Sequence, residues 1–214
     1  MYNSRMKLCE IAVISCFCFH PGLIQAQDRM PPIPADKQTP EQKKALELLA
    51  GTRGSVSTQG PFVPLLRSPE LLNRLQSVGE YLRFKNAVPQ KLVEMSILMT
   101  AGQLKQQYEW NVHYPLAIKA GLNAEVAAAI ATGQRPDGMV ADEAVTYDFV
   151  TELLRNRSVS DAAYAKFLAR FGEQGIIDTT TLVGYYSTLA LVLNVARSPA
   201  QVESTAPKLT PPSR

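Results

Sequence analysis

The apolar residues of this chain recur at intervals of three and four positions along most of its length, and no long stretch alternates apolar and polar residues. Two segments, Thr39-Pro40-Glu41 and Ser68-Pro69-Glu70, carry a capping hydroxyl, a proline and then an acid, which is typical of a helix start. Because a half-buried strand needs a period of two, the pattern predicts an all-α fold, a compact bundle of about six to eight helices.

The start and stop signals predict the bounds of these helices. We expect helices over residues 39–50, 68–84, 89–104, 109–120, 123–132, 141–156, 160–171 and 176–196. The last approaches the length of a membrane span, but Asp178 and Asn194 lie within it. We therefore expect no membrane span, and interpret this helix as buried in the bundle or at a subunit interface.

The N-terminus predicts export. Arg5 and Lys7 precede an apolar run that is too short for a membrane span, and Ala26 supplies a small residue at a cleavage position. We expect residues 1–26 to be a cleaved signal peptide and the protein to be periplasmic or secreted. Two alternatives are an uncleaved start and a lipoprotein anchored at Cys16.

The rest of the chain divides by composition into three parts. Residues 27–60 predict a Pro-rich arm with a short helix, residues 61–200 a helical domain, and residues 201–214 a disordered tail.

Composition excludes two classes of function. All three cysteines (Cys9, Cys16 and Cys18) lie in the removable N-terminus, so a cleaved chain has no thiolate for redox chemistry. The formal charge of +3 is small and no dense Lys/Arg cluster occurs, so we expect no nucleic-acid partner. A packed core must then stabilise the mature protein without disulfides.

One imidazole would remain after cleavage, that of His113. Glu109 precedes it by four residues, which places both on one helix face, where the carboxylate can orient the ring. Trp110 can form a wall of a pocket, and Glu94 approaches only if the chain folds back near Gln106. From spacing alone, a surface ion pair is the alternative interpretation. We expect acid/base chemistry on a small molecule, without metal or cofactor.

Residues 62–196 resemble the carboxymuconolactone decarboxylase family, which includes the alkylhydroperoxidase D-like proteins. The resemblance rests on residues 94–101, on Tyr108-Glu109-Trp110-x-x-His113, on Gly121-Leu122 and on the helix of Glu125. In the peroxidase branch the motif is E-x11-C-x2-C-x3-H. Here Glu94 and His113 occupy its ends, and Gln106 and Glu109 occupy its cysteine positions. The chain therefore resembles a branch without the redox cysteine pair.

The resemblance implies an alkylhydroperoxidase D-like helical fold that assembles into a homo-oligomer, such as a trimer or hexamer, with the site near a subunit boundary. It implies a carboxy-lyase-like enzyme that acts on a small lactone or keto acid, with His113 as acid and Glu109 and Glu94 orienting it. Trp110, Tyr108 and Gln106 are the expected substrate-binding residues. Lys105, Lys119 and Arg135 are candidates to receive a substrate carboxylate.

Two other functions stay open at this point. The first is a non-catalytic helical binding or assembly protein on the same scaffold. The second is antioxidant activity of the peroxidase branch, which the missing cysteines disfavour. Convergence of the two carboxylates and the imidazole in a concave apolar site would favour the enzyme, whereas an imidazole that faces open solvent would favour the binding protein.

Overall fold

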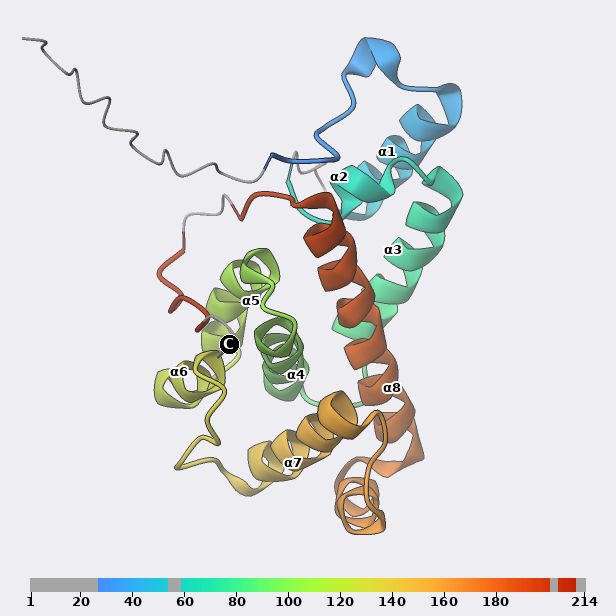
Figure 1. Ribbon diagram of the computed structural model, residues 1–214. Helices are drawn as coiled ribbons and strands as arrows, with labels where there is room; N and C mark the ends of the chain where they lie inside the picture. Colours follow the sequence, from blue (N-terminus) through green and yellow to red (C-terminus); the bar gives the residue numbers. More distant parts are fainter. Residues whose placement is uncertain (1–26, 54–58, 201–203, 211–214) are drawn as a thin grey trace, which may run out of the picture.

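The computed structural model describes residues 27–53, 59–200 and 204–210, and in these residues every regular element is a helix (Figure 1). The predicted all-α fold is therefore confirmed. After a single 3-10 turn (η1, Ala35–Lys37), the α-helices are α1 Pro40–Arg53, α2 Phe62–Leu65, α3 Pro69–Phe84, α4 Gln90–Gln103, α5 Gln107–Lys119, α6 Ala124–Ala131, α7 Ala141–Asn156 and α8 Asp161–Ala196. The expected signal peptide and its cysteines lie outside the described residues.

Local signals account for most helix bounds. In α3, the proline follows Ser68 as predicted, and at α6 the Asn123 side chain accepts a hydrogen bond from the Glu125 N–H (2.7 Å). The predicted boundary between two helices is present within α8 as a kink at Gly172. This residue has a non-helical φ of 67° and ψ of −179°, a conformation accessible to glycine alone.

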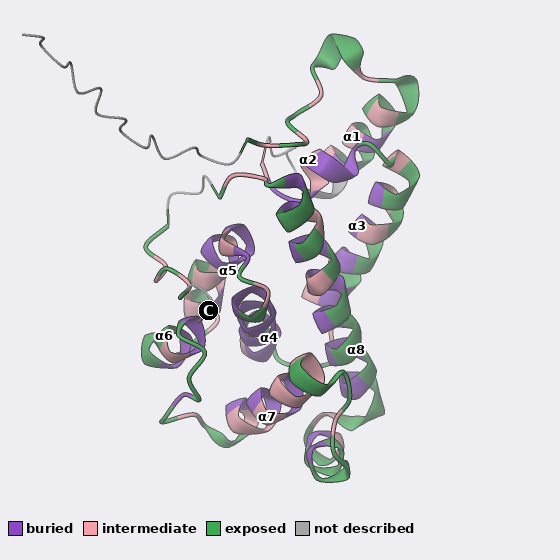
Figure 2. Cartoon of the chain, in the orientation of Figure 1, coloured by how far each residue is buried: buried purple, intermediate pink, exposed green. Residues whose placement is uncertain are grey.

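Helix α4 forms the centre of the bundle. It packs against α5, α6, α7 and α8, and Figure 2 shows it buried along most of its length. Its residues from Leu92 to Gly102 are all buried, which explains why the segment carries apolar residues on every face. Any polar side chain on α4 therefore needs a partner inside the protein.

Helix α8 lies between this group and the N-terminal helices (Figure 1). Its 36 residues include a stretch long and apolar enough to cross a membrane, but 56% of that stretch is buried inside the protein. Burial against α4, α7 and α3 gives the apolar residues a partner within the fold.

The N-terminal arm lies against the domain. The Arg29 N–H donates to the carbonyl of Ala196 (2.8 Å), and the Arg67 guanidinium donates to the carbonyl of Pro31 (2.8 Å). Ala45 and Leu49 of α1 are buried, so the helix of this arm contributes to the core.

Residues 204–210, part of the segment expected to be a tail, make contacts with the domain. The Ser204 hydroxyl donates to the carbonyl of Asn111 (3.2 Å) in α5, a helix that contains Pro115, and the Leu209 N–H donates to the Gln107 side chain (3.0 Å). Leu209 is partly buried against the core. The polar composition of the segment gave no indication that Leu209 packs against the core.

Candidate active site

The site is centred on His113 in α5. This helix begins after Gln106, whose side-chain carbonyl accepts a hydrogen bond from the Tyr108 N–H (2.9 Å) and so caps the helix. Glu109 lies one turn before His113 on the same face, and its Oε2 is 3.6 Å from His113 Nε2. The pair predicted from spacing is therefore present.

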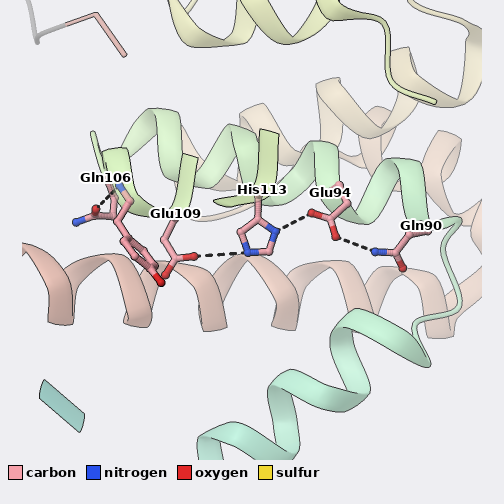
Figure 3. Close-up of polar contacts among 6 residues, drawn as sticks. Gln90, Glu94, Gln106, Glu109 and His113 are labelled. Atoms are coloured by element: carbon pink, nitrogen blue, oxygen red, sulfur yellow. Dashed lines mark hydrogen bonds and ion pairs between the residues drawn. The ribbon is translucent and has the colours of Figure 1, made fainter. Parts of the chain in front are cut away.

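Glu94 reaches His113 from α4 because the chain reverses between the two helices. Lys105 adopts a left-handed conformation (φ 53°), and the Gln106 N–H donates to a carbonyl in the last turn of α4 (2.9 Å). This turn places Glu94 Oε2 2.7 Å from His113 Nδ1. The other Glu94 oxygen accepts from Gln90 Nε2 (2.9 Å), so that the four side chains form a row across α4 and α5 (Figure 3).

All three ionisable groups of this row are buried. The exposed fractions are 3% for His113, 2% for Glu94 and 4% for Glu109, which excludes a surface ion pair. Because a carboxylate only accepts hydrogen bonds, we assign the imidazole proton to Nδ1, where it is donated to Glu94. The second nitrogen, Nε2, is then left to exchange a proton with whatever lies beside it.

A pocket of about 230 Å³ opens beside His113 and Glu109, which both line it. Arg83 of α3 adds a positive charge to its wall. Apolar and aromatic side chains from α1, α2, α5 and α8 form much of the rest, namely Leu49, Phe62, Val112, Tyr185, Tyr186 and Leu189. A concave, mainly apolar space with few polar groups is typical of a small-molecule site.

Tyr186 packs directly on the imidazole. Its ring meets that of His113 edge-on, with centroids 5.0 Å apart and an interplanar angle of 87°. Burial raises the pKa of the Tyr186 hydroxyl well above its ordinary value; Arg83 opposes the rise, and Glu109 and Glu94 add to it. Tyr186 is therefore a neutral phenol at any physiological pH.

Tyr108 is the expected substrate-binding residue that lines the pocket. Its hydroxyl lies against Gly60, where an added Cβ would be only 2.4 Å from the oxygen. The glycine therefore leaves the space that the tyrosine side chain occupies.

The structure places two other expected substrate-binding residues elsewhere. Trp110 is 0% exposed and does not line the pocket, because one residue beyond Glu109 is a rotation of about 100° around the helix. Gln106 is buried, caps α5 and donates from Nε2 to Asn194 Oδ1 (2.8 Å), so its polar groups bind the protein itself. None of the cations considered for a carboxylate, Lys105, Lys119 or Arg135, lines this pocket.

Sequence reasoning missed Arg83 and Tyr186. No spacing connects α3 or α8 to α5, since these helices are distant in the chain and meet only through packing. The one available signal was the pair Tyr185-Tyr186, two aromatic hydroxyls within an otherwise apolar helix. Among the residues that the structure describes, no three His, Cys, Asp or Glu side chains are grouped so as to hold a metal ion.

Comparison with known families agrees with this arrangement of Glu94, Glu109 and His113. Residues 69–152 match the model of the carboxymuconolactone decarboxylase family. This segment belongs to that family. No curated protein sequence matches the chain. The matched segment contains Arg83, Glu94, Glu109 and His113, whereas Tyr186 lies beyond it.

Membership of the carboxymuconolactone decarboxylase family agrees with the alkylhydroperoxidase D-like helical fold, and the family includes both decarboxylases and peroxidase-like members. In this chain the two positions that carry cysteine in the peroxidase branch hold Gln106 and Glu109. The segment is thus a member without the redox cysteine pair.

Proposed function

We propose that the chain is a cysteine-free acid/base lyase of the decarboxylase type, which acts on a small lactone or keto acid. The observation that supports this most is the position of His113, buried between Glu94 and Glu109 at the wall of a pocket of about 230 Å³. An oriented imidazole beside a small-molecule pocket suits proton transfer to a bound substrate.

The geometry supports different roles for the two carboxylates. Glu94, 2.7 Å from Nδ1, orients the ring, so it is a positioning residue. Glu109 lines the pocket 3.6 Å from Nε2, where it influences the charge around a bound substrate. His113 is then the catalytic residue, because its Nε2 lies on the side of Glu109, which lines the pocket.

In the proposed reaction, the bond between carbon and the departing carboxylate breaks and CO2 leaves. The electron pair passes into the conjugated carbonyl as an enolate, and the Nε2 proton of the imidazolium is then transferred to carbon. His113 regains a proton from solvent, so one proton is consumed for each CO2 released. Apolar wall residues such as Val112 and Leu189 disfavour the carboxylate charge of the starting state.

Substitution of the imidazole tests this proposal. His113→Ala should lower kcat by at least about 100-fold, the contribution of a general acid. The assay is CO2 release by the full chain from a panel of small lactone acids and β-keto acids, with circular dichroism as the control for folding. A folded His113→Ala protein with full turnover would reject the role of His113. Absence of turnover on the whole panel would favour the non-catalytic binding or assembly protein.

The peroxidase alternative has less support. The residues that the structure describes contain no cysteine, and Gln106 and Glu109 provide no sulfur at the two motif positions. Peroxide consumption by the mature protein, without residues 1–26, should therefore be absent when a dithiol donor is supplied.

Location and assembly complete the proposal. We propose export by residues 1–26 to the periplasm or the medium, and mass spectrometry of the exported protein measures both cleavage and any lipid at Cys16. We also propose a homo-oligomer, a trimer or hexamer, with α8 at the subunit boundary. Three exposed apolar residues of α8 support it, Ile177, Leu191 and Val195, and sedimentation equilibrium measures the state.

A further inference from the structure

Arg83 is held at the wall of the pocket. It lies in the last turn of α3, is half-buried, and lines the pocket together with His113 and Glu109. Its guanidinium carbon is 4.9 Å from the centroid of the Phe84 ring, a stacking contact that restricts the side chain. The guanidinium therefore has a defined place in the wall of the pocket that His113 also lines.

One hydrogen-bond donor of Arg83 has no acceptor among the described residues. Its Nε is buried and has no hydrogen-bond partner among the described residues. An ion pair does not compensate, since none joins Arg83 to a carboxylate in the described part of the chain. A buried donor without an acceptor is costly, so an acceptor supplied by a ligand would be bound favourably.

The charge of Arg83 decides which ligands can enter. Glu109 in the wall and Glu94 behind the imidazole would repel an anion that approaches His113. Among the described residues that line the pocket, Arg83 is the only lysine or arginine. Within the described part of the chain, an anionic substrate at His113 therefore has one permanent cation to bind.

We infer that Arg83 binds a carboxylate of the substrate that is retained in the product; this inference rests on the lyase function proposed above. A guanidinium fits a carboxylate with two parallel hydrogen bonds. The departing carboxylate must lose its charge to form CO2, and a cation bound to it would stabilise the starting state and slow the reaction. Arg83 thus binds a different anionic group and places the reacting carbon beside His113.

A purely structural arginine would behave differently. If Arg83 only offset the charge of Glu94 and Glu109, its loss would change stability and would affect acidic and neutral ligands alike. Only a guanidinium that touches the ligand distinguishes an acid from its uncharged ester.

Isothermal titration of the full chain tests the inference with levulinate and succinate as acidic probes and methyl levulinate as the neutral match. Arg83→Gln should weaken both acids by at least about tenfold, the loss of a charge-assisted hydrogen bond, and leave the ester unchanged. Arg83→Lys keeps the positive charge but cannot form two parallel hydrogen bonds, so its affinity for the acids should lie between those of the wild type and Arg83→Gln. Arg74→Gln, on the same helix but in a surface pair with Glu70, is the matched control and should change nothing.

Three results would overturn the inference: acid affinity unchanged in Arg83→Gln, an equal loss for acid and ester, or no acid binding by the wild-type chain. His113→Ala separates the two proposals, because it should bind levulinate normally while losing turnover. Acid binding that depends on Arg83 without turnover on any substrate would reject the lyase and leave the carboxylate site standing.

Discussion

The contact between Glu94 and His113 predicts a large and measurable coupling energy. The two side chains are 2% and 3% exposed, and the atoms Oε2 and Nδ1 are 2.7 Å apart. Removing one partner of such a buried pair costs about 3–5 kcal/mol, because the other is left without its hydrogen bond. We therefore expect Glu94→Ala and His113→Ala each to lower the free energy of unfolding by about this amount.

The double variant should cost less than the sum of the two. With both groups removed, neither is left buried without the other, so the coupling energy should be about 1.5–3 kcal/mol. Urea unfolding measures it through the fluorescence of Trp110, the single tryptophan of the chain, which is fully buried in α5.

An exposed ion pair provides the reference value for the coupling energy. Glu70 and Arg74 are 2.6 Å apart, but their side chains are 73% and 76% exposed. The same cycle on this pair should give only about 0.3–0.5 kcal/mol, because solvent screens the charges. A coupling energy for Glu94 and His113 no larger than that of the surface pair would refute the buried contact.

Two further predictions concern pH and backbone conformation. Burial raises the pKa of Tyr186, so the folded protein keeps the phenolic proton where the unfolded chain, with a pKa of about 10, has released it. This stabilisation is complete below about pH 10 and is lost as pH rises towards the folded pKa, so Tyr186→Phe should flatten the alkaline decline in chemical denaturation; parallel declines would contradict it. Gly172→Ala should cost about 1–3 kcal/mol through strain at φ 67°, since nothing lies within 4 Å of its added Cβ. Gly184→Ala, equally open but helical, should instead stabilise by about 0.5–1 kcal/mol, and thermal unfolding compares the two.

The sequence predicted the features that depend on local chemistry. The start of α3 follows from Pro69 at its first position, although the Ser68 side chain makes no capping hydrogen bond. The pairing of Glu109 with His113 follows from a separation of one helical turn. The contact of Glu94 with His113 could be predicted only in part. The sequence permitted a chain reversal near Lys105, and the family motif favoured the contact.

The features that arise from packing between distant helices could not be predicted. Arg83 and Tyr186 reach the pocket only because α3 and α8 pack near α5, and no periodicity within one helix records that arrangement. Trp110 shows that proximity in sequence is not sufficient, since it lies three residues before His113 but is fully buried and does not line the pocket.

The C-terminal residues have a consequence for how this protein is divided into parts. Pro115 has no N–H to offer the carbonyl four residues before it, that of Asn111, and the Ser204 hydroxyl donates to that oxygen instead. A gap in the backbone ladder, two residues from the imidazole, is thus repaired by a side chain that lies well past the family segment 69–152. A fragment ending at residue 200 would carry every residue of the site and still lack the repair to the helix that holds His113.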